Sequence, residues 1–300
     1  MNFEDLLTQN YGALKDPRCK TEVIDYLRNN PSIENKSIDF IQIFTKVAHL
    51  ILESDPNALE GLLERLFRYN EEGARKIKSD PRKNEFLRLE FYLLAYAGET
   101  ANVIFEKTKE LGWAEKWYES SKASADLSTE SEPIHSAYAY GFAGDAAKAL
   151  LKKTGDLEWG KKWYEDCKKS AEMSIEFEPK HSFYSYSFAA DAARALFYTT
   201  EDTSWAKEWY ALDKKSADMS VESDPTHAVN SYIFAGNAAK ALLRAAPSEK
   251  TWAKKAIRCF RAALGCYESH PDMEINIKLI EHARKGVNYL QRRRKERWDK

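Results

Sequence analysis

Three histidines recur in the same surroundings, and such a set could in principle hold a metal ion. His135, His181 and His227 each stand two positions after a proline and 46 residues from the next. Side chains at equivalent positions of stacked helical units lie on the order of 10 Å apart, because neighbouring helix axes are about 8–10 Å apart. Zinc–nitrogen bonds are about 2 Å long, so one ion cannot collect two of these rings. We expect each histidine to bond to the preceding helix and predict no metal site.

Acidic pairs just before the same prolines could act as general acid and base. They are Glu130/Glu132, Glu176/Glu178 and Glu222/Asp224. Negative charge is favoured at the start of a helix, and a threefold repeat of the pair suits a structural role better than one active site. No Walker A, GxGxxG, GxSxG or HExxH pattern occurs in the chain. We therefore predict a non-enzymatic protein with no catalytic residues and no cofactor.

Tryptophans spaced four apart could stack the bases of a single-stranded nucleic acid. The pairs are Trp113/Trp117, Trp159/Trp163 and Trp205/Trp209, each followed by small serines on the same side. Large rings beside small residues are more typical of helix packing, so we predict that these tryptophans are buried. The one basic cluster, Arg292–Arg297, suits the negative end of a helix. A weak phosphate-binding or targeting patch is the alternative for this cluster.

These residues all belong to one internal repeat of 46 residues. Prolines 133, 179, 225 and 271 keep that interval, as do the segments AGDAAKAL, AADAARAL and AGNAAKAL. A period of 20–50 residues indicates stacked supersecondary units. Helical periodicity places first helices near 134–153, 180–199 and 226–245, and second helices near 113–131, 159–177, 205–223 and 250–269. No strand pattern occurs, so the predicted fold class is all-α.

The first helices have two distinct faces. One face repeats a tyrosine, two alanines and a leucine, and small residues at its centre allow neighbouring backbones to approach closely. These packing residues are Tyr140, Ala143, Ala147, Leu150, then Tyr186, Ala189, Ala193, Leu196, then Tyr232, Ala235, Ala239, Leu242. Large residues at one end and small ones at the other suggest wedge-shaped packing and a curved stack.

The predicted organisation has three parts. Residues 1–84 form an N-terminal helical cap with diverged repeats, 85–271 the repeat array, and 272–300 a C-terminal capping helix that starts near Met273 and has a basic end. Within the cap we expect helices near 6–14, 20–30, 37–54 and 57–79. The last two close on Ser-Asp-Pro, where an N-cap aspartate and an N1 proline should start the next helix.

Composition limits the function. The formal net charge of −1, from 46 basic and 47 acidic side chains, argues against a general polyanion binder. The N-terminus lacks the apolar segment of a signal peptide, and no apolar run reaches the roughly 18 residues of a membrane span. Cys19, Cys167, Cys259 and Cys266 show no CxxC pairing. We expect reduced thiols in a cytoplasmic protein.

The alternating helices, the Gly-Asp or Gly-Asn core, the aromatic second helix and the Asp-Pro end resemble tetratricopeptide (TPR) repeats. The resemblance covers about 85–271 and, more loosely, 38–81. It implies a right-handed, curved solenoid of antiparallel helix pairs with capping helices at both ends. The TPR period is 34 residues, whereas this one is 46, so each helix is longer by about a turn and a half. TPR proteins are mainly protein-interaction scaffolds, and the resemblance implies that role here.

A polar stripe on the first helices lies about 200° away from the packing face. Its members are Tyr138, Asp145, Lys148, Lys152, Tyr184, Asp191, Arg194, Tyr198, Asn230, Asn237, Lys240 and Arg244. By the resemblance, this stripe would line a concave groove and bind a partner. Lys240, Arg244 and Asn237 also look like part of the carboxylate clamp of some TPR domains. The alternative is a solvated face with ion pairs Asp145–Lys148 and Asp191–Arg194, worth about 0.2–0.5 kcal/mol each.

We therefore predict a scaffold that binds a protein or peptide segment in the groove. The alternative is a helical repeat protein that binds RNA or single-stranded nucleic acid through its basic C-terminal helix.

Overall fold

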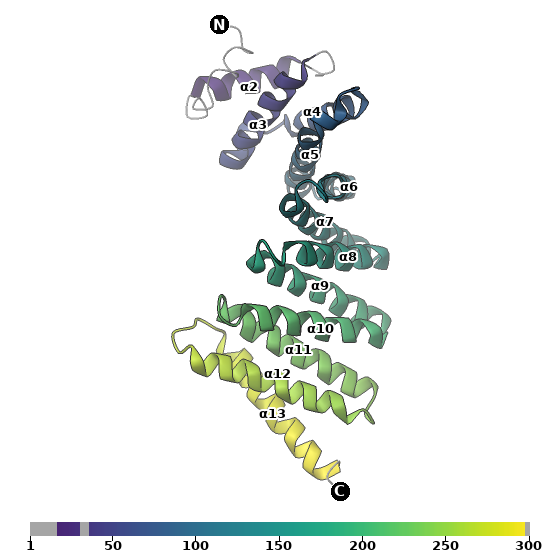
Figure 1. Cartoon of the computed structure of the whole chain (residues 1–300), viewed down its shortest axis with the longest axis vertical. Coiled ribbons are helices and arrows are strands. Elements are labelled where there is room, and N and C mark those ends of the chain that lie inside the picture. Colours follow the sequence, from purple (N-terminus) through teal and green to yellow (C-terminus); the bar gives the residue numbers. More distant parts are fainter. Residues whose placement is uncertain (1–16, 31–35, 298–300) are drawn as a thin grey trace. The chain divides into compact units, whose positions relative to one another are not determined.

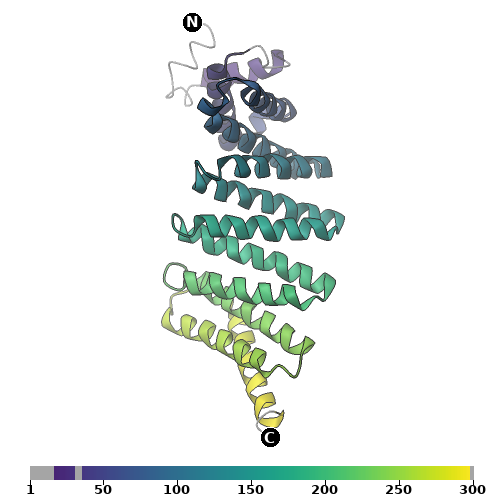
Figure 2. The ribbon, with the colours of Figure 1, turned by 45° about the vertical axis from the view of Figure 1, so that its right-hand side comes forward.

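The computed structural model describes residues 17–30 and 36–297, and this part of the chain contains helices and no strand. Within each of its two compact units, helices that follow one another in the sequence pack side by side (Figures 1 and 2). The fold is therefore an all-α, solenoid-like array of helix pairs, which confirms the predicted fold class. The chain divides into two compact units, residues 1–153 (unit 1) and 154–300 (unit 2), and each is described by itself.

Unit 1 begins with shorter helices and ends with the first regular pairs. Its elements are α2 (Pro17–Asn29), α3 (Ile38–Ser54), the 3-10 turn η2 (Pro56–Leu59), α4 (Leu63–Ser79), the 3-10 turn η3 (Lys83–Glu85), α5 (Leu87–Thr108), α6 (Leu111–Ser128) and α7 (Pro133–Thr154). The helix expected over 6–14 lies outside the described residues.

The prediction that each Ser-Asp-Pro starts a new α-helix is wrong in unit 1. Asp55 does cap the following segment, since its Oδ1 accepts from the Ala58 amide at 3.3 Å, but that segment is only the turn η2. Gly61 then takes a left-handed φ of +76°, and the predicted single helix over 57–79 starts only at Leu63. At the next site Asp80 Oδ1 accepts from the Arg82 amide at 2.8 Å, which closes a turn rather than starting a helix.

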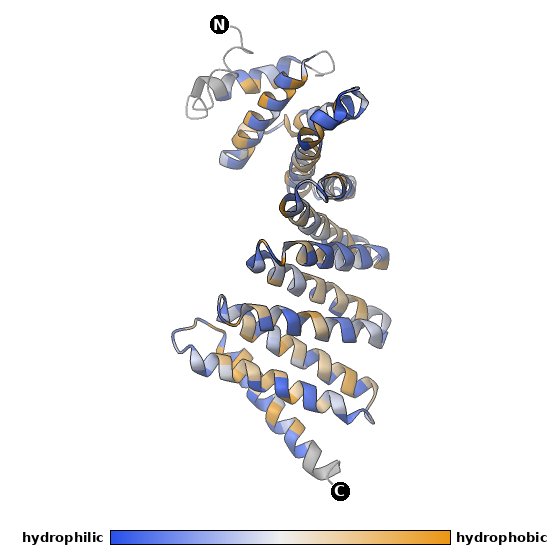
Figure 3. Cartoon of the chain, in the orientation of Figure 1, coloured by the Kyte–Doolittle hydropathy of each residue, from blue (hydrophilic) through white to orange (hydrophobic). Residues whose placement is uncertain are grey.

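Unit 2 contains three further helix pairs. They are α8 (Leu157–Ser174) with α9 (Pro179–Thr200), α10 (Thr203–Ser220) with α11 (Pro225–Ala245), and α12 (Lys250–Ser269) with α13 (Ile277–Arg297). The helices match the predicted ranges closely except α13, which starts later than expected. Asn276 Oδ1 accepts from the Lys278 amide at 3.0 Å and fixes the new start. We call α5, α7, α9 and α11 the A helices, and α6, α8, α10 and α12 the B helices; the A helices are the more apolar (Figure 3).

The predicted packing faces are buried except at Tyr232, which is half-buried. Ala143, Ala147, Ala189 and Ala193 are all fully inaccessible, as the small-residue centre of the A helices requires. Of the tryptophans, Trp113, Trp117, Trp163 and Trp209 are buried, while Trp159 and Trp205 are half-buried. Burial of these four rings contradicts a base-stacking role for them.

The three recurrent histidines bond to the preceding B helix, as expected. Ser124 Oγ lies 2.9 Å from His135 Nε2, Ser170 Oγ lies 2.9 Å from His181 Nε2, and Ser216 Oγ lies 2.8 Å from His227 Nε2. Two of these serines also donate to a carbonyl of the previous A helix, namely Ser124 to Phe91 and Ser216 to Phe183, each at 2.7 Å. Ser124 and Ser216 therefore each tie three successive helices together, and the histidines act in packing.

Three of the four A helices, α5, α7 and α9, end in left-handed residues. The φ angles are +60° at Lys109, +70° at Gly155 and +56° at Glu201, and these positions are 46 residues apart. The Lys109 amide donates to the Phe105 carbonyl at 2.7 Å, and the Glu201 amide to the Phe197 carbonyl at 2.8 Å. This closure turns the chain sharply from an A helix into the next B helix.

Candidate functional site

A groove in unit 2 brings together five residues of the predicted stripe. It lies between the A helices α9 and α11, and its cavity measures about 790 Å³. The five stripe residues that line it are Arg194, Tyr198, Asn237, Lys240 and Arg244. We call this cavity groove 2.

Aromatic rings form the walls of groove 2. Phe197 and Tyr198 come from α9, Phe234 from α11, and Trp209 from the intervening helix α10. Trp209 is only 2% exposed, so the groove meets one edge of a ring that otherwise belongs to the core, whereas Tyr198 is 66% exposed. The Tyr198 and Trp209 ring centroids are 5.9 Å apart.

Arg194 lies over these aromatic walls. Its guanidinium carbon is 5.3 Å from the centre of the Phe234 ring and 5.9 Å from that of Trp209. It also forms the predicted ion pair with Asp191, at 2.6 Å. Stacking of a guanidinium on aromatic faces holds its planar fork in a fixed direction.

The far end of groove 2 is basic. Lys240 and Arg244 stand one helical turn apart on α11, and neither forms an ion pair with any residue in the described part of the chain. Burial, together with the Arg244 charge, lowers the pKa of the Lys240 ammonium. Asn237, one turn earlier, accepts at Oδ1 from His282 Nε2 at 2.9 Å. Burial and the charges of Lys240 and Lys285 lower the pKa of His282.

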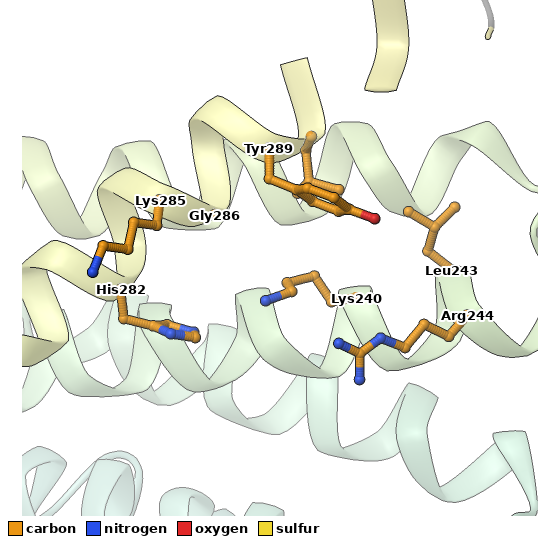
Figure 4. Close-up of a pocket in the computed structure, with 8 residues that line it drawn as sticks. Lys240, Leu243, Arg244, His282, Lys285, Gly286 and Tyr289 are labelled. Carbon is orange, nitrogen blue, oxygen red and sulfur yellow. The ribbon is translucent and has the colours of Figure 1, made fainter. Parts of the chain in front are cut away.

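The basic end continues into a second, smaller cavity between α11 and α13. This cavity of about 290 Å³ is lined by Lys240, Arg244, His282, Lys285 and Tyr289, among others. Figure 4 shows the Lys240 ammonium pointing toward the His282 ring, with the Arg244 guanidinium beside it and Tyr289 on the α13 side. Lys240, Arg244 and Lys285 thus line one continuous surface.

A buried carboxyl group lies beneath groove 2. Trp209 Nε1 donates to Asp213 Oδ2 at 2.7 Å, and the Asp213 side chain is buried. Burial, assisted by the Asp191 carboxylate, raises the pKa of Asp213 well above its usual range. The buried Asp213 carboxyl group therefore packs beneath groove 2 and orients the Trp209 ring.

The other predicted stripe residues lie elsewhere. Asp145, Lys148 and Lys152 line a separate cavity in unit 1, and Tyr138 lines a small one of about 190 Å³ beside His135. Tyr184, Asp191 and Asn230 line none of these cavities.

Tyr184 has a structural contact instead. Its hydroxyl donates to Asp224 Oδ2 at 2.6 Å. That bond, with burial, raises the pKa of Tyr184 to about 12. Tyr184 therefore helps to fix the capping residue of α11.

Sequence reasoning missed the aromatic walls and the contribution of α13. Phe142 and Phe234 follow the repeat interval and precede the buried small-residue core, so their spacing was a usable signal. His282, Lys285 and Tyr289 lie outside the repeat and have no such signal. Of the basic cluster 292–297, Arg292 is exposed and the other side chains lie outside the described residues.

Metal binding and membrane insertion were the other possibilities to compare with the described residues. In the described residues, no group of three or more His, Cys, Asp or Glu side chains is placed to hold a metal ion. Cys167, Cys259 and Cys266 are buried, and none of them is in a disulfide among the residues that the structure describes. Among the described helices, none combines the length and the apolarity that crossing a bilayer requires.

No protein-family model matches the chain, and the search of curated proteins finds no match. Among solved structures, the chain is similar to BtubC (BKLC) from P. vanneervenii, with 10% identity and a TM-score of 0.49, over 92% of this chain and 95% of that one. It is also similar to a circular tandem repeat protein with novel repeat topology and enhanced subunit contact surfaces, with 14% identity and a TM-score of 0.41, over 97% of this chain and 75% of that one. A DHF58 filament has 14% identity and a TM-score of 0.22, over 93% of this chain and 99% of that one. With TM-scores below 0.5, these likenesses carry no information about function.

Proposed function

We propose that the protein is a non-enzymatic scaffold that binds a segment of a partner protein in groove 2. The observation that carries this proposal is the pairing of aromatic walls with Lys240 and Arg244, which have no ion pair in the described part of the chain. Two cations one helical turn apart repel each other, and their repulsion is relieved when an anion binds between them.

The size and chemistry of groove 2 suit a peptide segment. Its volume of about 790 Å³ falls within the range of about 300–1,000 Å³ that is usual for binding cavities. Tyrosine, tryptophan and arginine are the residues that most often anchor protein interfaces, and Tyr198, Trp209 and Arg194 lie here together. A partner would place an apolar side chain against the rings and a carboxylate near the two cations.

The resemblance to TPR repeats supports the same role, because A helices line the binding surface in that family. The finer parts of the proposal, a TPR-like repeat and a cytoplasmic location, rest on the sequence alone. The carboxylate-clamp resemblance of Asn237, Lys240 and Arg244 is consistent with a ligand that carries an acidic group.

Quantitative co-purification from the native lysate tests the proposal. We would compare the wild-type chain with Arg194→Glu/Lys240→Glu and with a control, Lys254→Glu/Arg261→Glu, whose exposed α12 side chains line no cavity described above. Both double variants change the net charge equally. We expect a defined set of proteins that binds the wild type and the control but not the groove variant. Equal recovery with all three chains would refute groove 2 as the binding site.

A further inference from the structure

We infer that unit 1 carries a second binding groove of the same construction, and that both grooves take acidic protein segments with an apolar side chain. This inference rests on the proposed function and extends it from one site to two. The second cavity, groove 1, lies between the A helices α5 and α7 and measures about 540 Å³.

The two grooves correspond residue by residue. Each residue that lines groove 1 stands 92 residues, or two repeat intervals, before one that lines groove 2. His282 of α13 is the one lining residue of groove 2 without a counterpart. Positions that keep the same amino acid are Phe105/Phe197, Trp117/Trp209, Phe142/Phe234, Lys148/Lys240 and Ala149/Ala241. The walls and the innermost lysine are therefore the same in both units.

Both grooves also end in cations near the C-terminus of an A helix. Lys152 occupies the position of Arg244, and Lys153 follows it. Lys152 and Lys153 are exposed, and neither has an ion pair among the residues that the structure describes. Charge complementarity selects an acidic occupant, since a basic segment would meet like charges in both grooves.

Two acidic side chains, Asp145 and Glu106, line groove 1 beside its lysines. Asp145 of groove 1 corresponds to Asn237 of groove 2, and burial raises the pKa of the Asp145 carboxyl group. Glu106 is paired with Lys109. Four lysines line groove 1 against these two acids, so the lysines set the sign of the local field.

The grooves differ where Arg194 stands in unit 2. Groove 1 has Asn102 there, and Asn102 Oδ1 and Trp117 Nε1 are both buried without a hydrogen-bond partner in the described part of the chain. In groove 2, Asp213 accepts from the equivalent indole, and Arg194 stacks on the wall. Groove 1 therefore has no counterpart of the Arg194 guanidinium, and we expect it to bind the same acidic segment more weakly than groove 2 does.

The test is the stoichiometry of acidic peptide binding to the full chain. The probe is the tightest binder from a library of acidic peptides with one randomised apolar position, measured by isothermal titration calorimetry and native mass spectrometry. A library with lysine in place of the acidic residues is the control for charge. Three double variants are compared with the wild type: Lys152→Glu/Lys153→Glu in groove 1, Lys240→Glu/Arg244→Glu in groove 2, and Lys254→Glu/Arg261→Glu as the matched control.

We expect two peptides per wild-type chain, two on the control, and one on each groove variant. The remaining site of the groove 2 variant should be the weaker one. One peptide per wild-type chain, with binding untouched by the groove 1 variant, overturns this inference and leaves the proposed function standing. No binding of any acidic peptide to the wild type overturns both. If circular dichroism shows that Lys152→Glu/Lys153→Glu has lost helix, the milder variant Lys152→Gln/Lys153→Gln replaces it. The same outcomes then apply.

Discussion

Replacing Ser216 by alanine should destabilise unit 2 by about 1–2 kcal/mol. Ser216 is fully buried, and its Oγ contacts both the Phe183 carbonyl and His227 Nε2. A hydroxyl group has one hydrogen, and a carbonyl oxygen can only accept, so the hydrogen of Ser216 goes to Phe183. His227 must therefore donate from Nε2, which fixes its tautomer. Burial lowers the pKa of His227, in keeping with a neutral ring.

The magnitude follows from the groups that alanine would leave behind. A buried donor without a partner costs about 1–3 kcal/mol. The His227 Nε2–H keeps one weaker neighbour, Ser231 Oγ at 3.2 Å, so the lower part of that range applies. The Phe183 carbonyl lies within α9, where the helix still supplies a hydrogen bond to its other lone pair.

Urea unfolding followed by circular dichroism measures this cost. The control is Ser187→Ala, a half-buried α9 position whose side chain has no hydrogen bond among the described residues, and it should change stability by less than about 0.5 kcal/mol. Ser124→Ala in unit 1 repeats the experiment, because Ser124 has the same two partners there. A loss for Ser216→Ala no larger than that for Ser187→Ala would show that the serine–histidine contact does not hold the helices together.

Three further predictions concern unit 2. Burial raises the pKa of Asp213, so the unfolded chain loses the Asp213 proton above about pH 4, whereas the folded chain loses it only at higher pH. The free energy of unfolding should therefore fall as the pH rises through that interval. Asp213→Asn, which can still accept from Trp209, should remove this dependence of stability on pH in urea titrations at successive pH values. Burial lowers the pKa of His227, so stability should also fall as the pH drops below about 6.5, and His227→Gln should reduce that loss in acid-unfolding curves. A Cβ atom at Gly236 would lie 2.6 Å from Cε1 of the buried Phe260 ring, so Gly236→Ala should cost about 1–3 kcal/mol by calorimetry, and adding Phe260→Leu should recover part of it.

The all-α array of helix pairs could be predicted from the sequence because its local signals agree. Proline at the first position of α7, α9 and α11 fixes where each helix begins, and the small-residue core marks the buried face. In the N-terminal region the same Ser-Asp-Pro signal failed, because Asp80 and its neighbours satisfy each other within a turn. A local capping signal starts a long α-helix only where the residues that follow can also pack in a helical conformation.

The candidate site could be predicted only in part. The polar stripe located Arg194, Lys240 and Arg244, since a helical face follows from spacing alone. The aromatic walls depend on which rings of neighbouring helices meet at the groove. Spacing alone therefore predicts that Trp209 belongs to the core, although it also lines the cavity. His282 reaches the site from a helix outside the repeat, and spacing within the repeat cannot reveal it.

The left-handed ends of the A helices point to a compromise between stability and function. Glycine adopts this backbone conformation without strain, whereas a residue with a side chain is held there at a cost on the order of 1 kcal/mol. The chain uses glycine at 155, but it carries Lys109 and Glu201 at the two positions that line groove 1 and groove 2. Selection for stability alone would favour glycine at all three. The two strained side chains therefore stand at the two grooves, and the proposed binding function gives a reason for keeping a side chain there at a cost in stability.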